Sequence, residues 1–206
     1  MATYDDPRIL RAIAHPTRNR ILAELAALGA SRAADLAQTL EIPANQASFH
    51  LRQLAKYGLV EEAPEEARDR RDRVWRLAGD QEVTIRAQDI TSQPGGRAAM
   101  EVYRRSASAR GHALVEAAYA EPVEGVERVI SEDAIRLTGA EALELSQELR
   151  EVVLRWRRHG ATGDGRSGEE TAEQRTTYSL YQLLQPYPEV FADVAEPVRI
   201  RGFGGA

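Results

Sequence analysis

One segment decides how the rest of the chain is interpreted: Ile42-Pro43-Ala44-Asn45-Gln46-Ala47-Ser48-Phe49-His50-Leu51-Arg52-Gln53-Leu54. At the period of an α-helix, Ala47, Leu51 and Leu54 fall on one apolar face, at spacings of four and three. The opposite face carries no carboxylate. Its side chains are Asn45, Gln46, Ser48, Phe49, Arg52, Gln53 and Lys56. Amides and cations of this kind hydrogen-bond to base edges and phosphates.

A shorter helix is predicted directly before this segment, from residue 32 to residue 40. Ser31 is the expected N-cap, and the apolar side consists of Ala34, Leu36, Ala37 and Leu40. Only Glu41-Ile42-Pro43 separates the two helices. Two helices joined by a tight turn, with a polar outer face on the second, form a helix-turn-helix pattern.

The residues after the second helix predict a β-hairpin. Gly58 suits the left-handed position that ends a helix. Residues 59–63 and 74–77 are predicted to be two antiparallel strands, and residues 64–73 form a polar loop between them. The basic residues of that loop are Arg68, Arg70, Arg71 and Arg73. A hairpin with a basic tip after a helix-turn-helix is the wing of a winged helix.

Several landmarks of residues 6–77 resemble the ArsR-type winged-helix repressors. They are Ala12-Ile13-Ala14-His15-Pro16-Thr17-Arg18-Asn19-Arg20-Ile21-Leu22, Asp35-Leu36-Ala37, Ser48-Phe49-His50-Leu51 and Gly58-Leu59-Val60, in the order and spacing of that family. The resemblance implies sequence-specific binding to double-stranded DNA, and repression as the output. The chain has no cysteine. It therefore departs from the metal-sensing members of the family, whose best-known site is a cysteine pair.

Charge is unevenly distributed along the chain. The net charge is −5, but residues 1–77 contain twelve basic against eleven acidic side chains, and the remainder fifteen against twenty-one. The local patch governs the attraction of DNA, and a balance of +1 is small, so we expect a dimer to combine two patches. No apolar run approaches membrane-spanning length, and the expected location is the cytoplasm. Lysine is almost absent beside abundant arginine and alanine, which suggests a GC-rich bacterial genome.

The expected fold class is mainly α with a small β component. A winged helix-turn-helix domain is predicted over residues 1–79, and a C-terminal α/β region for dimerisation or sensing over residues 80–206. Residues 83–90 are expected to form a short strand or a linker, and residues 97–120 a long helix. Thr138-Gly139-Ala140-Glu141 is a capping box for a helix to about Arg158, whose apolar seam is Ala142, Leu145, Leu149, Val152 and Trp156.

Two further strands are predicted, over residues 126–137 and residues 177–184. A pocket for an unknown small-molecule effector, if one exists, would lie between the C-terminal helices and the second of these strands. Tyr178, Tyr181 and Trp156 would line that pocket, and the alternative is that these aromatic rings are ordinary core.

Three residues of the helix-turn-helix region allow two interpretations each. His15 is either a ligand or titrating switch, or a residue that bonds local backbone. His50 lies at the border of the core face, and we favour packing combined with a phosphate contact over metal binding. Phe49 either packs partly buried against the wing or meets a thymine methyl group.

No catalytic constellation, metal site or cofactor motif is predicted. The chain contains no phosphate-binding glycine loop, nucleophile elbow or zinc motif. His112 and Glu116 are four residues apart and, with His159, could hold a metal, but exposed polar side chains are the preferred interpretation. The arginines of the loop 64–73 could likewise be a solvated face, and Trp75 is expected in the core.

The sequence favours a homodimeric DNA-binding transcriptional regulator that recognises a pseudo-palindromic operator. Asn45, Gln46, Phe49 and Arg52 are expected to read bases, and Ser48, His50 and Lys56 to contact the DNA backbone. Arg68, Arg70, Arg71 and Arg73 of the wing are expected to approach phosphates or the minor groove. The alternative is a winged helix that binds another protein, although such modules more often expose apolar residues than this face does.

Overall fold

Two prolines mark the starts of the first two helices in the computed structural model, which describes residues 6–67, 73–79, 87–162 and 176–186. Helix α1 spans Pro7–Ala14 and helix α2 spans Pro16–Leu28. The Asp6 carboxylate caps α1 by accepting the backbone N–H of Arg8 at 2.8 Å, as the sequence predicts for a proline at the first helical position. Gly29, with φ of +79°, ends α2.

The helix-turn-helix consists of α3 (Ala33–Thr39) and α4 (Ala44–Ala55). The turn between them closes with the Ile42 N–H donating to the Ala37 carbonyl at 2.9 Å. The predicted N-cap role of Ser31 is wrong. Residues Ser31–Arg32 form a short strand, β1, paired with residues 74–75 of the wing, and a pairing so distant in sequence is invisible to local capping rules.

The wing is a three-stranded antiparallel sheet. Strands β2 (Val60–Glu62) and β3 (Val74–Leu77) form the predicted hairpin, and β1 completes the strand order β1-β3-β2. A 3₁₀ turn, η1 (Pro64–Glu66), follows β2. Trp75 on β3 is 4% exposed and packs in the core, as its position on the inner side of the strand predicts.

One hydrophobic core joins the winged helix to the helices that follow. Leu10 and Leu51 are fully buried in it, together with Ile90 of α5 (Ala87–Thr91) and Met100 of α6 (Gly96–Ala118). Burial of each large apolar side chain contributes about 1.5–3 kcal/mol. The core therefore extends across residue 79, where composition suggests a boundary.

The buried residues of helix α6 lie in its first half, apart from Gly111 farther along. Its N-terminal turns pack against α1, and the Ser106 hydroxyl donates to the Ala14 carbonyl at 2.5 Å. Farther along, Val115 is 48% exposed, and Tyr119 just after the helix is 71% exposed. The second half of α6 thus extends beyond the core.

Helix α7 (Gly139–Thr162) begins at the predicted capping box. The Glu141 carboxylate accepts the Thr138 N–H at 2.7 Å and the Thr138 hydroxyl at 2.8 Å, and the Glu141 N–H donates back to that hydroxyl at 3.3 Å. The helix packs against α2, which leaves most of its predicted apolar seam in solvent.

The two strands predicted in the C-terminal half are not strands. Residues 126–137 and 176–186 follow irregular paths without a β-ladder, and Val129 and Leu183 are 91% and 67% exposed. Their apolar patterns favour an extended chain, but strand formation also needs a hydrogen-bonding partner. Of the segment 83–90, residues 83–86 lie outside the described residues, and the remainder belongs to α5 rather than to a strand.

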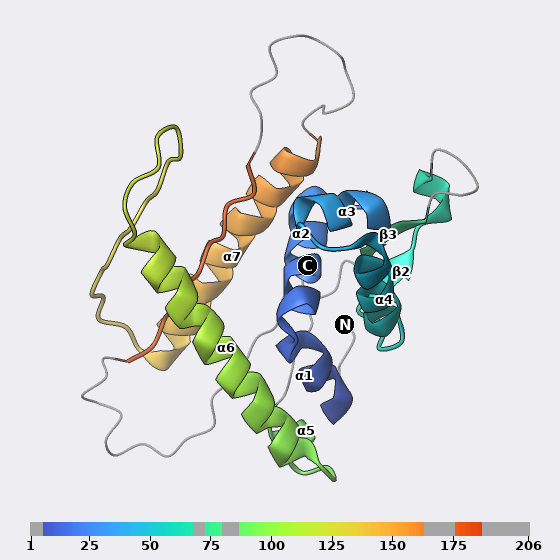
Figure 1. Cartoon of the computed structure of the whole chain (residues 1–206). Helices are drawn as coiled ribbons and strands as arrows, with labels where there is room; N and C mark the ends of the chain where they lie inside the picture. Colours follow the sequence, from blue (N-terminus) through green and yellow to red (C-terminus); the bar gives the residue numbers. More distant parts are fainter. Residues whose placement is uncertain (1–5, 68–72, 80–86, 163–175, 187–206) are drawn as a thin grey trace.

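Figure 1 shows how these elements are arranged around α1 and α2. Helix α4 and the wing lie on one side, and α6 and α7 lie on the other. Segment 176–186 runs close to both C-terminal helices, where Tyr181 covers Gly111 so closely that a Cβ there would lie 2.7 Å from the Tyr181 hydroxyl.

Candidate nucleic-acid interface

The outer face of α4 is polar and exposed, as predicted. Its core side is anchored by Ala47, Leu51 and Leu54, none of which has measurable exposure. Because these three residues fix the rotation of the helix, the opposite side chains must face away from the core. Those that are exposed are Asn45, Gln46, Phe49, Arg52 and Lys56, whereas Ser48 and Gln53 are half-buried.

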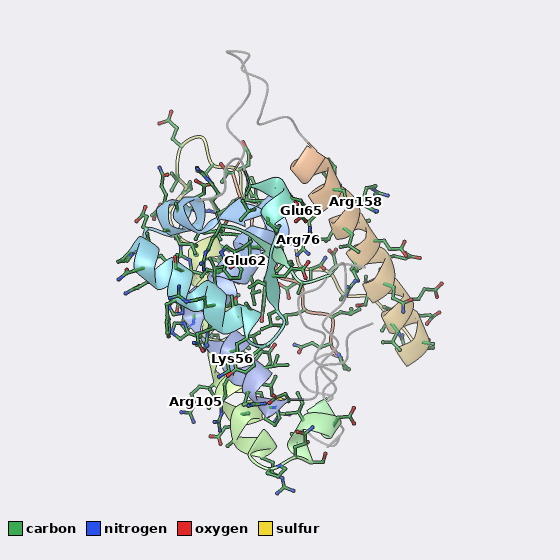
Figure 2. The ribbon with its side chains drawn as sticks, turned by 90° about the vertical axis from the view of Figure 1, so that its right-hand side faces the viewer. Lys56, Glu62, Glu65, Arg76, Arg105 and Arg158 are labelled. Atoms are coloured by element: carbon green, nitrogen blue, oxygen red, sulfur yellow. The ribbon has the colours of Figure 1, made fainter. Side chains whose placement is uncertain are left out.

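The two cations of this face have no partner within the described part of the chain. Arg52 and Lys56 make no side-chain hydrogen bond or ion pair with any residue that the structure describes. Figure 2 shows Lys56 near the end of α4. The first turn of α4 has no acidic side chain, and the helix dipole there also favours an anion. The face can therefore accept negatively charged or hydrogen-bonding groups without first breaking a described contact.

Phe49 and His50 have different surroundings although they are adjacent. The Phe49 side chain is 51% exposed, and its only described ring neighbour is His50, at a centroid distance of 5.4 Å in an edge-on arrangement. His50 is only 8% exposed and lies against His15, with ring centroids 4.7 Å apart. The ring of Phe49 is therefore half-exposed, and His50 packs at the edge of the core as predicted.

The carboxylates of the wing are paired with arginines from the same hairpin. Arg76 donates to Glu61 at 2.8 Å and to Glu65 at 2.5 Å, and it lies 3.9 Å from Glu66. Glu61 and Arg76 face each other directly across β2 and β3, and Figure 2 shows Arg76 beside Glu65. The hydrogen bond to Glu61, followed by the charge of Glu65, raises the pKa of Arg76. One guanidinium thus lies within ion-pair distance of three of the four carboxylates that precede the wing tip.

The predicted basic tip is only partly described. Arg73 is 65% exposed and lies 3.6 Å from Glu62, so the cation is loosely paired and still accessible. Arg68, Arg70 and Arg71 lie outside the described residues. Arg76 was not predicted as part of this surface from the sequence. The register of the hairpin, which places Arg76 opposite Glu61, would have suggested their ion pair.

The possible metal ligands His112, Glu116 and His159 are only partly described. Over the described ranges, no three histidine, aspartate or glutamate side chains form a group able to hold a metal ion. His112 and Glu116 are both exposed on α6, and the side chain of His159 is outside the described residues. None of the described helices is long and apolar enough to cross a membrane.

The aromatic residues proposed for an effector pocket are exposed. Tyr178, Tyr181 and Trp156 are 64%, 44% and 65% exposed, so in the single chain they are neither a pocket lining nor plain core. The pocket interpretation assumed a strand over residues 177–184, and these residues form none. An open hollow of about 490 Å³ lies instead between the start of α1 and the α5–α6 turn, at Asp6, Pro7, Arg8, Arg11, Gln93, Pro94 and Gly95.

Comparison with known proteins supports the same interpretation of the N-terminal region. A family model described as a helix-turn-helix domain matches residues 13–63, the stretch that holds α2, α3, α4 and β2. Residues 13–63 therefore form a helix-turn-helix domain. A comparison with curated proteins gives no match.

Three solved structures are similar to parts of the chain. YusO from Bacillus subtilis is 14% identical, with 71% of this chain and 82% of that chain covered and a TM-score of 0.32. A mutant of ZitR from Lactococcus lactis, in its apo form, is 16% identical over 72% and 88%, with a TM-score of 0.29. A mutant of MarR from E. coli is 16% identical over 71% and 86%, with a TM-score of 0.32. At these TM-scores the similarity does not establish a common overall fold.

Proposed function

We propose that this protein is a sequence-specific, double-stranded-DNA-binding transcriptional regulator, that it acts as a homodimeric repressor, and that it belongs with the ArsR-type proteins. The observation that carries the proposal is the exposed, carboxylate-free face of α4, where Arg52 and Lys56 have no partner among the described residues. On the second helix of a helix-turn-helix, such a face is placed to enter the major groove.

The side chains of α4 divide into two roles by their position. Asn45, Gln46, Phe49 and Arg52 are exposed along α4 and are assigned to base edges, where amides suit adenine, arginine suits guanine and an apolar ring suits the thymine methyl. Ser48, which is half-buried, and Lys56, at the C-terminal end of the helix, are assigned to the DNA backbone. His50 keeps its assignment to the backbone through the edge of its ring, since most of that ring is buried.

The wing is assigned to phosphates or to the adjacent minor groove. Arg73, together with Arg68, Arg70 and Arg71, would supply the positive charge. The pairing of Arg76 with Glu61 and Glu65 supports this role, because unpaired carboxylates on the same hairpin would repel the DNA backbone.

The homodimer is supported by the apolar surface of the C-terminal half. Among the described residues, nearly all exposed large hydrophobic side chains follow residue 100, and before it only Leu28 and Phe49 are of this kind. Leu149, Val152 and Trp156 of the α7 seam are 37%, 40% and 65% exposed. A surface of this character usually marks an association site, and a second copy of the chain would also double the small positive patch of the winged helix.

Selection from a pool of random DNA duplexes tests the proposed function. Wild-type protein should enrich a pseudo-palindromic motif with half-sites separated by one helical turn or a small multiple of it. The variant Asn45→Ala/Arg52→Ala should lose that enrichment, while Arg105→Ala, on the exposed surface of α6, should retain it. Failure of the wild type to enrich any motif would favour the alternative, a winged helix that binds another protein through Phe49.

A further inference from the structure

His15 and His50 form a pair that sequence inspection does not reveal. His15 lies at the junction of α1 and α2, and His50 lies on the inner edge of α4. Their ring centroids are 4.7 Å apart, with the planes inclined at 46°. The recognition helix therefore rests on the α1–α2 junction partly through two imidazole rings.

The described neighbours of the pair are cationic rather than acidic. Arg18 of α2 faces both rings, and Tyr57, just beyond α4, faces the Arg18 guanidinium in turn. The Nη2–H group of Arg18 donates a hydrogen bond to the Arg11 carbonyl at 3.0 Å. The Nδ1 atoms of both histidines and the Nε of Arg18 are buried without a hydrogen-bond partner. Among the described residues, no carboxylate is placed to stabilise a positive charge on either ring.

The backbone of His15 is held firmly on both sides. Its carbonyl accepts the Asn19 N–H at 3.0 Å and so begins α2. The preceding carbonyl, that of Ala14, accepts the Ser106 hydroxyl of α6. The junction that carries His15 is thus tied to α2 and to α6 by backbone acceptors, and a repulsion between the rings would act on α4 from this side.

We propose that His15 is a positioning residue that seats the recognition helix through His50, and that protonation of this pair loosens α4 and releases DNA. The part that concerns DNA rests on the proposed function. The neutral pair packs, with one ring covering the other. A proton on either ring places a cation beside the other imidazole and beside Arg18.

The direction of the pH effect follows from burial. Burial is the largest cause that lowers the pKa of His50, and His15 and Arg18 lower it further. Burial also lowers the pKa of His15, and the charge of Arg18 adds to that effect. The unfolded chain then takes up protons at a higher pH than the folded one. The contribution of the pair to stability is complete above the ordinary histidine pKa of about 6.5. It falls as the pH drops through the lowered pKa values.

Imidazole titration and thermal unfolding of the full chain test the pair without DNA. In wild-type protein, the NMR signals of His15 and His50 should titrate below the ordinary histidine pKa of about 6.5. The unfolding midpoint should fall by at least about 3 °C between pH 7.5 and pH 5.5. His112→Gln should show the same fall, and His15→Gln/His50→Gln a much smaller one. Titration of both paired rings at or above a pH of about 6.5 would overturn the proposal, even if the double variant does not fold.

Binding to a fluorescent random-sequence duplex tests the second half of the proposal. Between pH 7.5 and pH 5.5, the affinity for the duplex should fall in the wild type and in His112→Gln. The fall should be about tenfold larger than in His15→Gln/His50→Gln. Parallel losses in all three proteins would overturn the role of the pair in DNA release. A wild type that binds no duplex at any pH would contradict the proposed function instead, while the titration and unfolding results would still decide whether the pair seats α4.

Discussion

At the scale of single residues, Arg52 is the side chain on which the proposed sequence preference depends most. It is exposed on α4 and has no described protein partner, so its five donors are available to a guanine edge. Replacement by alanine should cost about 1–3 kcal/mol on the selected site and relax the preference at one base pair. Affinity measurements on the selected and on a scrambled duplex check this. An equal loss on both would make Arg52 a phosphate contact.

The wing arginines should act differently, through charge and without base preference. Removal of one phosphate-contacting cation lowers the log–log salt dependence of binding by about one unit. Arg70→Ala and Arg71→Ala are expected to show this decrease. Arg73→Ala should show a smaller one, because Arg73 is already loosely paired with Glu62. Titrations at several salt concentrations measure the slope. A slope equal to that of the wild type in Arg70→Ala and Arg71→Ala would place both side chains in free solvent.

At the scale of elements, the β2–β3 hairpin depends on Arg76 to hold its acidic residues. In Arg76→Ala the carboxylates of Glu61 and Glu65 would face the DNA without a counter-charge, so binding to every duplex should weaken. The triple variant Arg76→Ala/Glu61→Gln/Glu65→Gln should recover most of the affinity, because it removes the repulsion as well. If the triple variant binds as poorly as Arg76→Ala, the arginine itself contacts DNA. Fluorescence anisotropy with a random-sequence duplex measures all three proteins.

The elements also show which features local sequence can predict. The apolar spacing of α4, the glycine after it and the capping box at Thr138 rest on contacts within a few residues, and the hairpin joins two strands that are consecutive along the chain. The structure confirms each of these features. Strand β1 was missed because its partner, β3, is more than forty residues away in sequence. The contact between His15 and His50 was missed for the same reason, since it forms only when the α1–α2 junction packs under α4.

The two incorrect strand predictions have a different cause. Residues 126–137 and 177–184 carry apolar side chains suited to a sheet, and the error lay in assuming that a neighbouring strand exists within one chain. The candidate interface was easier to predict, because the orientation of α4 depends only on Ala47, Leu51 and Leu54. Which of its exposed side chains read bases remains a prediction.

At the scale of the whole molecule, the exposed seam of α7 should determine the oligomeric state. Leu149→Glu/Val152→Glu places charges on that seam and should convert a dimer into monomers with a strongly reduced affinity for a full pseudo-palindromic site. Leu28→Glu, at an exposed leucine at the end of α2, is the matched control and should leave the mass unchanged. Light scattering at several concentrations checks this outcome. A wild type that is monomeric at all concentrations would contradict the homodimer.

The core that unites α1, α4 and α6 has a consequence for the geometry of the target. Because Met100 of α6 and Leu51 of α4 belong to the same cluster, a dimer assembled through the C-terminal half would hold its two reading helices at a fixed distance and angle. Insertion of about five base pairs between the half-sites turns the second one by about half a helical turn, to the opposite face of the duplex. Binding should therefore vary periodically with spacer length, and strong sites should recur at intervals of about ten base pairs.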